Sequence, residues 1–169
     1  MNLKDQTLSR NFRELLGRGE IPLGQSVFPV NLRRDDLLKA VSNYLNRKPK
    51  EWNADNHKWN KDQLDIDILW YPSQPVFLTF RNGDLVLIEF SGSSEGPSKW
   101  DYLLEVQKYF RIKKDVIKHL GEETRSNELD RQNMEAAWEF AKLTLYVACD
   151  ARTGGCGIGL RVLERANEV

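Results

Sequence analysis

Residues 75–90 read PVFLTFRNGDLVLIEF, two runs of apolar, β-branched and aromatic residues joined at Asn82 and Gly83. Asn-Gly is the pair favoured in a two-residue type I′ turn, because both turn positions need positive φ and these two residues adopt it at low cost. We therefore predict a β-hairpin over residues 75–90, with the other elements of the chain packed around it.

The two-residue turn also predicts the register of this hairpin. One predicted face holds six residues: Val76, Leu78, Phe80, Leu85, Leu87 and Glu89. The opposite face is largely apolar too, so we predict cover on both sides, or on one side plus a partner. Glu89 is the single ionisable group on the first face. It is either at the sheet margin, paired with a base, or functional.

The pattern outside the hairpin predicts an α+β fold. Residues 64–70 alternate as in a half-buried strand, and residues 71–74 suit a turn, so residues 64–90 form a small antiparallel β-meander. Apolar residues at helical spacing predict four helices that cover it, over residues 4–16, 32–46, about 99–121 and 126–149. Residues 143–147, LTLYV, fit a strand equally well, and a C-terminal edge strand is possible. We expect one domain over residues 1–169.

Composition excludes several classes of function. The 25 Lys and Arg balance 25 Asp and Glu, so no global field attracts nucleic acid or an anionic membrane. No apolar run approaches the roughly 20 residues that cross a bilayer, and residues 1–19 lack the apolar core of a signal peptide. Cys149 and Cys156 are too few for a disulfide scaffold or a four-ligand zinc site. These features predict a cytoplasmic protein with two reduced thiols and no cofactor.

Charge is nevertheless unevenly distributed. Residues 1–50 carry a net charge of +5 and residues 51–100 a net charge of −4. Residues 47–63 are the most polar segment, yet they contain Trp52 and Trp59. Such a long segment is ordered by its two rings or is functional. Basic residues near these rings allow contact with nucleic acid, but the interspersed acids favour a solvated surface: Arg33, Arg34, Arg47, Lys48, Lys50 and Lys58.

Three carboxylates form the sharpest catalytic candidate. If the turn at 71–74 aligns the strands, Asp65 and Asp67 face the same side of the sheet as Glu89, where they can hold Mg²⁺ against a phosphate. This arrangement loosely resembles the acidic centre of the PD-(D/E)xK nucleases. It departs from their pattern because Phe90 and Ser91 follow Glu89, with no lysine two residues on.

Two further candidates carry less specific signals. Residues 153–159, TGGCGIG, can cradle a nucleotide phosphate if a strand precedes them and a helix follows, but they match neither the Rossmann nor the Walker pattern. A glycine-rich reversal before a final strand is the simpler interpretation of residues 154–159. A Cys149–His119 nucleophile pair is disfavoured, because Cys149 lies on the predicted apolar stripe.

With no catalytic set, the sequence favours a non-enzymatic module that binds another protein. In size and character this profile is similar to the small immunity proteins that neutralise bacterial toxins, and an adaptor fits equally. The predicted binding residues are Trp52, Trp59, Asp65 and Asp67, which would face a partner with a basic surface. The alternative is a metal-dependent nuclease or phosphodiesterase that uses Asp65, Asp67 and Glu89.

Overall fold

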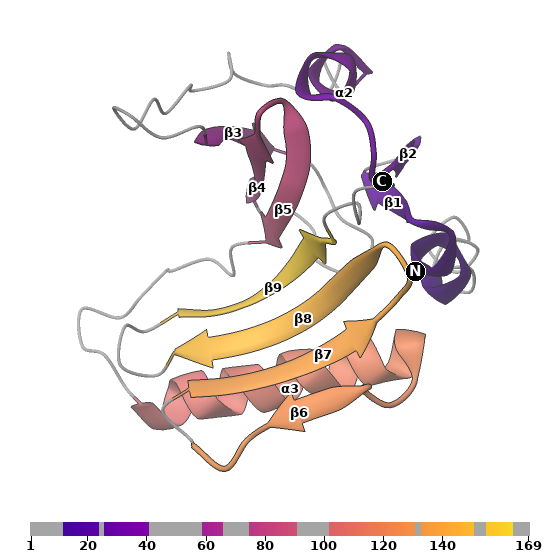
Figure 1. Ribbon diagram of the computed structural model, residues 1–169. Coiled ribbons are helices and arrows are strands. Elements are labelled where there is room, and N and C mark those ends of the chain that lie inside the picture. Colours follow the sequence, from indigo (N-terminus) through magenta and orange to yellow (C-terminus); the bar gives the residue numbers. More distant parts are fainter. Residues whose placement is uncertain are drawn as a thin grey trace.

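The computed structural model describes residues 12–23, 26–40, 59–65, 75–90, 102–130, 133–150 and 155–163. Its strands are β1 (Glu20–Leu23), β2 (Ser26–Pro29), β3 (Trp59–Asp65), β4 (Pro75–Arg81), β5 (Asp84–Phe90), β6 (Arg125–Asn127), β7 (Asn133–Glu139), β8 (Leu143–Asp150) and β9 (Gly155–Val162). Residues 12–18 are helical, and two further helices follow, α2 (Arg34–Ala40) and α3 (Tyr102–Leu120). The described residues are therefore mostly β (Figure 1).

The predicted fold of four helices over a small meander is wrong. The described strands form an antiparallel seven-stranded sheet, ordered β3-β4-β5-β9-β8-β7-β6, and a two-stranded sheet of β1 and β2. Residues 126–149, predicted as a helix, instead contain β7, most of β8 and part of β6. From Leu145 onward burial alternates along β8: Leu145, Val147 and Cys149 are fully buried, whereas Tyr146, Ala148 and Asp150 are partly exposed. Helix-forming Met, Ala and Glu residues in β7 are thus overridden by pairing with β8.

The hairpin at residues 75–90 is confirmed. Asn82 and Gly83 have φ values of 53° and 86°, as a type I′ turn requires. The first two predicted pairs are present, Arg81 with Asp84 and Phe80 with Leu85. Beyond them the predicted register is wrong, because the pairing shifts between Thr79 and Phe80.

This shift is a β-bulge that places one extra residue, Val86, in β5. Thr79 now pairs with Leu87, and Phe77 pairs with Glu89. Because side chains alternate across a strand, the extra residue sends Ile88 into the core instead of Leu87. Glu89 consequently leaves the predicted core-facing row and lies on the opposite face of the sheet.

The meander differs from its prediction at the first strand. β3 spans Trp59–Asp65 and pairs with β4 in full, from Trp59 opposite Arg81 to Asp65 opposite Pro75. The predicted strand at residues 64–70 therefore overlaps β3 only at its first two residues. The rest of that prediction, with the turn at residues 71–74, lies outside the described residues.

β9 is the strand that joins the two halves of the large sheet. It pairs with β5 on one side and with β8 on the other, so it is central in the sheet and not the predicted edge strand. Gly159 pairs with Glu89 in β5 and with Tyr146 in β8, so these three residues lie in one row across three neighbouring strands. The hairpin of β4 and β5 thereby becomes part of a continuous sheet with β6–β9.

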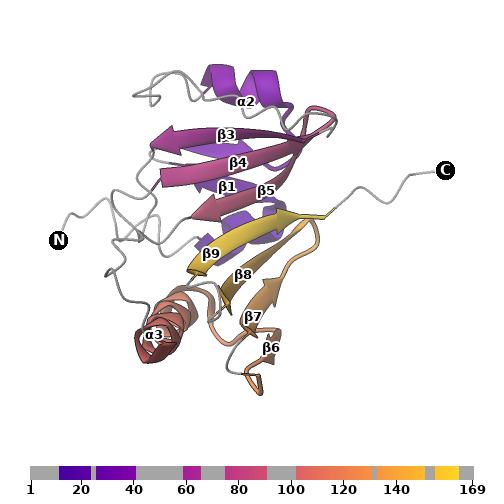
Figure 2. The same cartoon turned by 90° about the vertical axis from the view of Figure 1, so that its left-hand side faces the viewer.

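One face of this sheet is covered and contains the core. α3 packs on β7, β8 and β9, and Figure 2 shows it along one side of the sheet. Towards the hairpin end, apolar residues of the N-terminal elements join the same core: Phe12, Leu16, Ile21, Phe28, Val30 and Leu37. None of the helices that the structure describes combines the length and the hydropathy that a membrane span requires.

The end of α3 matches the predicted stop at Gly121. This glycine has a φ of 77°, and its N–H donates to the Ile117 carbonyl at 2.8 Å. The Trp138 indole N–H donates to the Gly121 carbonyl at 2.8 Å, and the Arg13 guanidinium donates to the Leu120 carbonyl. The last turn of α3 is therefore anchored both to β7 and to the N-terminal helix.

We predict that Gly83→Ala destabilises the protein by about 1 kcal/mol, because a Cβ is strained at positive φ. The added atom would also lie 2.5 Å from the flexible guanidinium of Arg33, which must move. Gly17→Ala is the matched control, since nothing lies within 4 Å of its new Cβ. Urea denaturation of both variants measures the difference. Equal stabilities would contradict the strain argument.

Candidate functional site

The second face of the large sheet is the most distinctive surface of the described residues. Figure 1 looks onto this face over β6–β9, with α3 behind the strands. In Figure 2 no other described element packs on the side of β7–β9 away from α3. Side chains at alternating positions in these strands therefore point toward a surface that the described helices leave open.

Tyr146, Gly159 and Arg161 form an organised group on this face. A Cβ on Gly159 would lie 2.2 Å from Cζ and 2.3 Å from the hydroxyl oxygen of Tyr146, so the Tyr146 ring lies directly over Gly159. The guanidinium carbon of Arg161 is 5.0 Å from the centre of that ring, in a cation–π contact. Glycine at 159 is therefore what allows Tyr146 to lie flat against β9.

Burial and neighbouring charges shift the pKa of the Tyr146 hydroxyl. Burial and the negative charge of Glu89 raise its pKa to about 12, although the positive charge of Arg161 opposes the rise. Glu89 is directly opposite Gly159 in the register, so it flanks the hydroxyl end of Tyr146. We call Glu89, Tyr146, Gly159 and Arg161 the Tyr146 face.

A charged cluster continues this surface toward β6. Arg125 forms ion pairs with Glu135 at 2.9 Å and Glu139 at 3.0 Å. The hydrogen bond to Glu139 and the charge of Glu135 raise the pKa of Arg125. Ala137 lies opposite both Arg125 and Tyr146 and is fully buried. Aromatic and charged groups of both signs therefore lie side by side across β6–β9.

The predicted binding residues do not come together in the described structure. Trp59 and Asp65 are the first and last residues of β3, seven residues long, so they lie at opposite ends of an outer strand of the sheet. Trp52 and Asp67 lie outside the described residues.

The register also separates two members of the proposed metal site. Asp65 is opposite Pro75, whereas Glu89 is opposite Phe77, two residues along the neighbouring strand. Two strand spacings and two residues place their Cα atoms roughly 12 Å apart. This separation gives no support to a shared Mg²⁺ on Asp65 and Glu89, and Asp67 lies outside the described residues.

The glycine-rich segment is a strand for most of its length. Gly155–Val162 forms β9, so the predicted reversal at residues 154–159 is wrong within the described part. Main-chain groups of β9 pair with β5 and β8 instead of forming a phosphate cradle. Gly155, Gly157 and Gly159 alternate, so all three fall on the face that carries Tyr146.

The prediction of two reduced thiols is also wrong. Cys149 and Cys156 are directly opposite in β8 and β9 and form a disulfide. The expectation that Cys149 is buried is confirmed, because both cysteines lie against α3 with exposures of 0% and 4%. A nucleophilic Cys149 is excluded in this oxidised form.

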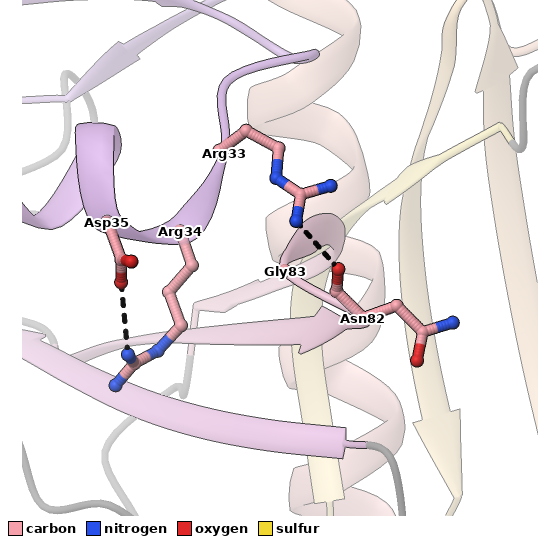
Figure 3. Close-up of a pocket in the computed structure, with 5 residues that line it drawn as sticks. All are labelled: Arg33, Arg34, Asp35, Asn82 and Gly83. Carbon is pink, nitrogen blue, oxygen red and sulfur yellow. Dashed lines mark hydrogen bonds and ion pairs between the residues drawn. The ribbon is translucent and has the colours of Figure 1, made fainter.

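A small hollow near the hairpin turn has a structural role. It measures about 290 Å³ and is lined by Arg33, Arg34, Asp35, Asn82 and Gly83. Arg33 donates to the Asn82 carbonyl at 3.0 Å and pairs with Asp84 at 3.1 Å, and Arg34 pairs with Asp35 at 3.4 Å. Figure 3 shows the two guanidinium groups pointing in different directions. The Arg33 guanidinium therefore holds the turn, the Arg34 guanidinium pairs within α2, and the two do not converge.

The pKa shifts in the described residues do not prepare a proton-transfer site. Burial and the Glu128 carboxylate raise the pKa of Tyr109, and ion pairing raises that of Lys113 and lowers that of Glu123. With Tyr146 and Arg125, each shift moves a group further from neutral pH. A general acid or base needs the opposite change.

Comparisons with known proteins bear on the fold alone. No protein-family description matches the sequence, and no curated protein matches it. The fold is similar to that of a DUF4309 family protein, YjgB, from Bacillus subtilis subsp. subtilis str. 168, with a TM-score of 0.54 and 12% identity. The match covers 96% of this chain and 100% of that one. The similarity supports the fold of the described residues.

Sequence reasoning missed Tyr146 and Arg161. The available signal was the period of two in Gly155, Gly157 and Gly159, which is typical of a strand with one bare side. Finding Tyr146 required the pairing of β8 with β9, which no local pattern reports.

Proposed function

We propose that this protein is a non-enzymatic module that binds another protein through the Tyr146 face. The observation that carries the proposal is the packing of Tyr146 over Gly159, with the Arg161 guanidinium 5.0 Å from the ring centre. Tyrosine and arginine are enriched in interface hot spots, because each offers a large contact area together with polar groups. A ring held against a central strand also loses little side-chain entropy on binding.

The electrostatics of the face are consistent with recognition and not with catalysis. A tyrosine with a pKa of about 12 stays neutral at physiological pH, so it supplies a hydroxyl donor but no base. Glu89 and Arg161 place charges of opposite sign near it, which favours a partner of complementary pattern. A partner with a basic surface remains our proposal for the acidic residues at β3, where Trp59 and Asp65 would extend the contact.

The biological setting is part of the same proposal. An immunity-type or adaptor role fits a small protein with one organised face. A cytoplasmic location stays a prediction, and the Cys149–Cys156 disulfide argues against it, since such bonds persist mainly in oxidising compartments.

We predict that Gly159→Ala abolishes partner binding with little loss of stability. The new Cβ would displace the tip of the Tyr146 ring, which is a movable part of a flexible side chain. Gly155→Ala is the matched control in the same strand, because its new Cβ meets nothing within 4 Å. The experiment uses four immobilised baits: wild type, Gly159→Ala, Gly155→Ala and Arg161→Ala. Each bait is exposed to extract of the source organism, and mass spectrometry identifies the proteins that it retains.

A protein retained by wild type and Gly155→Ala, but lost with Gly159→Ala and Arg161→Ala, is the expected result. Denaturation curves for each bait establish that the variants are folded. Retention that is equal on all four baits, or none above the blank matrix, would contradict binding through this face.

A further inference from the structure

The Cys149–Cys156 disulfide lies beside an acidic side chain from the helix above it. Both cysteines point to α3, and Glu105 is in the first turn of that helix. The Glu105 carbonyl oxygen is 3.1 Å from the sulfur of Cys156 and 3.7 Å from that of Cys149. A carboxylate oxygen of Glu105 and both sulfurs lie within 4.8 Å of one another.

One oxygen of this carboxylate has no hydrogen-bond partner among the residues that the structure describes. Oε2 of Glu105 is shielded from solvent, and no hydrogen-bond donor among the described residues reaches it. A buried acceptor without a donor costs about 1–3 kcal/mol, so proteins rarely retain one without a reason. The disulfide sulfurs cannot relieve it, because they carry no hydrogen.

We propose that reduction of this disulfide creates a zinc site formed by Cys149, Cys156 and Glu105. A dithiol gives up two electrons and two protons and becomes a disulfide itself, whereas a phosphine gives up two electrons and becomes its oxide, with water supplying the oxygen and the two protons. Either reductant cleaves the sulfur–sulfur bond and leaves two thiols. Zn²⁺ then replaces both thiol protons, which are released to solvent, and the Glu105 carboxylate completes three protein ligands. Three ligands leave the fourth tetrahedral position open, as in catalytic rather than closed structural zinc sites.

The geometry allows this with small movements. Ligand atoms of a tetrahedral zinc site lie roughly 3.3–3.8 Å apart, given zinc–sulfur and zinc–oxygen bonds of about 2.3 and 2.1 Å. The carboxylate oxygen lies within 4.8 Å of both sulfurs, so it has only a short way to move, and the sulfurs separate once their bond is broken. Two thiolates and a carboxylate leave a net charge of −1 around Zn²⁺, which the N-terminal end of the 19-residue α3 stabilises.

The donor set selects the metal. Thiolates favour Zn²⁺ and other thiophilic ions over Mg²⁺ or Ca²⁺, which take oxygen ligands. The disulfide form offers no thiolate, so binding depends on the redox state. The proposal is independent of partner binding at the Tyr146 face, because the cysteines lie on the opposite side of the sheet.

The test is a Zn²⁺ titration of the intact chain, oxidised and phosphine-reduced, in competition with a chromophoric chelator. We expect one Zn²⁺ per reduced chain and none for the oxidised chain. Glu105→Gln is expected to weaken binding by roughly tenfold or more, since even outer partners of a zinc site contribute that much. Glu122→Gln, an exposed acid beyond the end of α3, is the control and should bind as wild type.

Co²⁺ provides a second readout that does not depend on stability. Reduced wild type should show thiolate-to-cobalt charge-transfer absorption, and Cys156→Ser should lose it while circular dichroism confirms its fold. Equal Zn²⁺ binding by the oxidised and reduced chains would overturn the proposal. So would a Glu105→Gln variant with unchanged affinity, or a reduced chain that binds no zinc.

Discussion

Tyr109→Ala is expected to lower the free energy of unfolding by about 4 kcal/mol, the cost of truncating a large buried aromatic side chain. Tyr109 is fully buried between α3 and the sheet, and its hydroxyl donates to Glu128 at 3.0 Å. The variant therefore loses apolar packing and also leaves the Glu128 carboxylate without one of its donors. Urea denaturation monitored by circular dichroism measures the change.

The adjacent residue supplies the control. The Phe110 ring contacts Tyr109 edge to face at 5.2 Å, but its side chain is 46% exposed. Phe110→Ala should cost less than about 1 kcal/mol, because nearly half of this residue is already exposed to water. Tyr109→Phe isolates the hydroxyl and should cost about 1–2 kcal/mol. Similar losses for the two alanine variants would show that α3 does not pack as described.

Lys113→Met is expected to destabilise the protein by about 3 kcal/mol, the lower end for removing one partner of a buried ion pair. The Lys113 ammonium lies 2.5 Å from Glu123 and 2.6 Å from Glu128, and its side chain is only 13% exposed. Without this cation the two carboxylates repel each other in a partly desolvated site. Lys118→Met on the same helix removes an exposed pair with Asp115 and should cost less than about 0.5 kcal/mol.

The penalty at Lys113 should depend on pH in a defined direction. Burial opposes ionisation of Glu123, but the hydrogen bond and charge of Lys113, together with hydrogen bonds from the Glu123 main chain and Ser126, outweigh it and hold the Glu123 pKa below its usual 4.5. The contribution of ionised Glu123 to the free energy of unfolding is therefore present above pH 4.5 and is lost as pH falls through the lowered pKa. For Lys113, burial is likewise outweighed by both carboxylates, and its pKa rises above 10.5. The contribution of the charged Lys113 to the free energy of unfolding is present below pH 10.5 and is lost as pH rises through the raised pKa.

Urea denaturation at a series of pH values measures the pH range over which Lys113 and its carboxylate partners stabilise the protein. The difference between wild type and Lys113→Met should be largest between about pH 5 and 10 and should shrink in acid, where the carboxylates are neutral. Lys118→Met should show no such profile. A Lys113→Met penalty that is constant down to pH 3 would mean that packing of the lysine stem, and not its charge, stabilises the site.

The Tyr146 face shows why the candidate site could be predicted only in part. Glu89 was identified from its position among apolar residues, but its face depended on the bulge at Val86. A bulge is decided by how neighbouring strands pair, so the two-residue turn alone could not reveal it. Tyr146 gave no signal, because its contact partner Gly159 is 13 residues away on another strand.

Residues 126–149 show the same limit for the fold. Their Met, Ala, Glu and Leu residues match a helical period as well as an alternating one, so local pattern could not decide between them. The decision came from β8, which pairs with β7 on one side and β9 on the other. Two partner strands satisfy its main chain, and its alternating apolar residues are buried under α3.

By itself, the sequence determined the features that depend on neighbouring residues. The Asn82-Gly83 turn, the first pairs of the hairpin beside it, and the amphipathic α3 with its stop at Gly121 all follow from local backbone preferences and short periods. Only the tertiary structure decided the bulge, the central place of β9, the disulfide and the Tyr146 face. Each of these depends on contacts between residues that are distant in the sequence, and such contacts stabilise the structure only once the strands have paired.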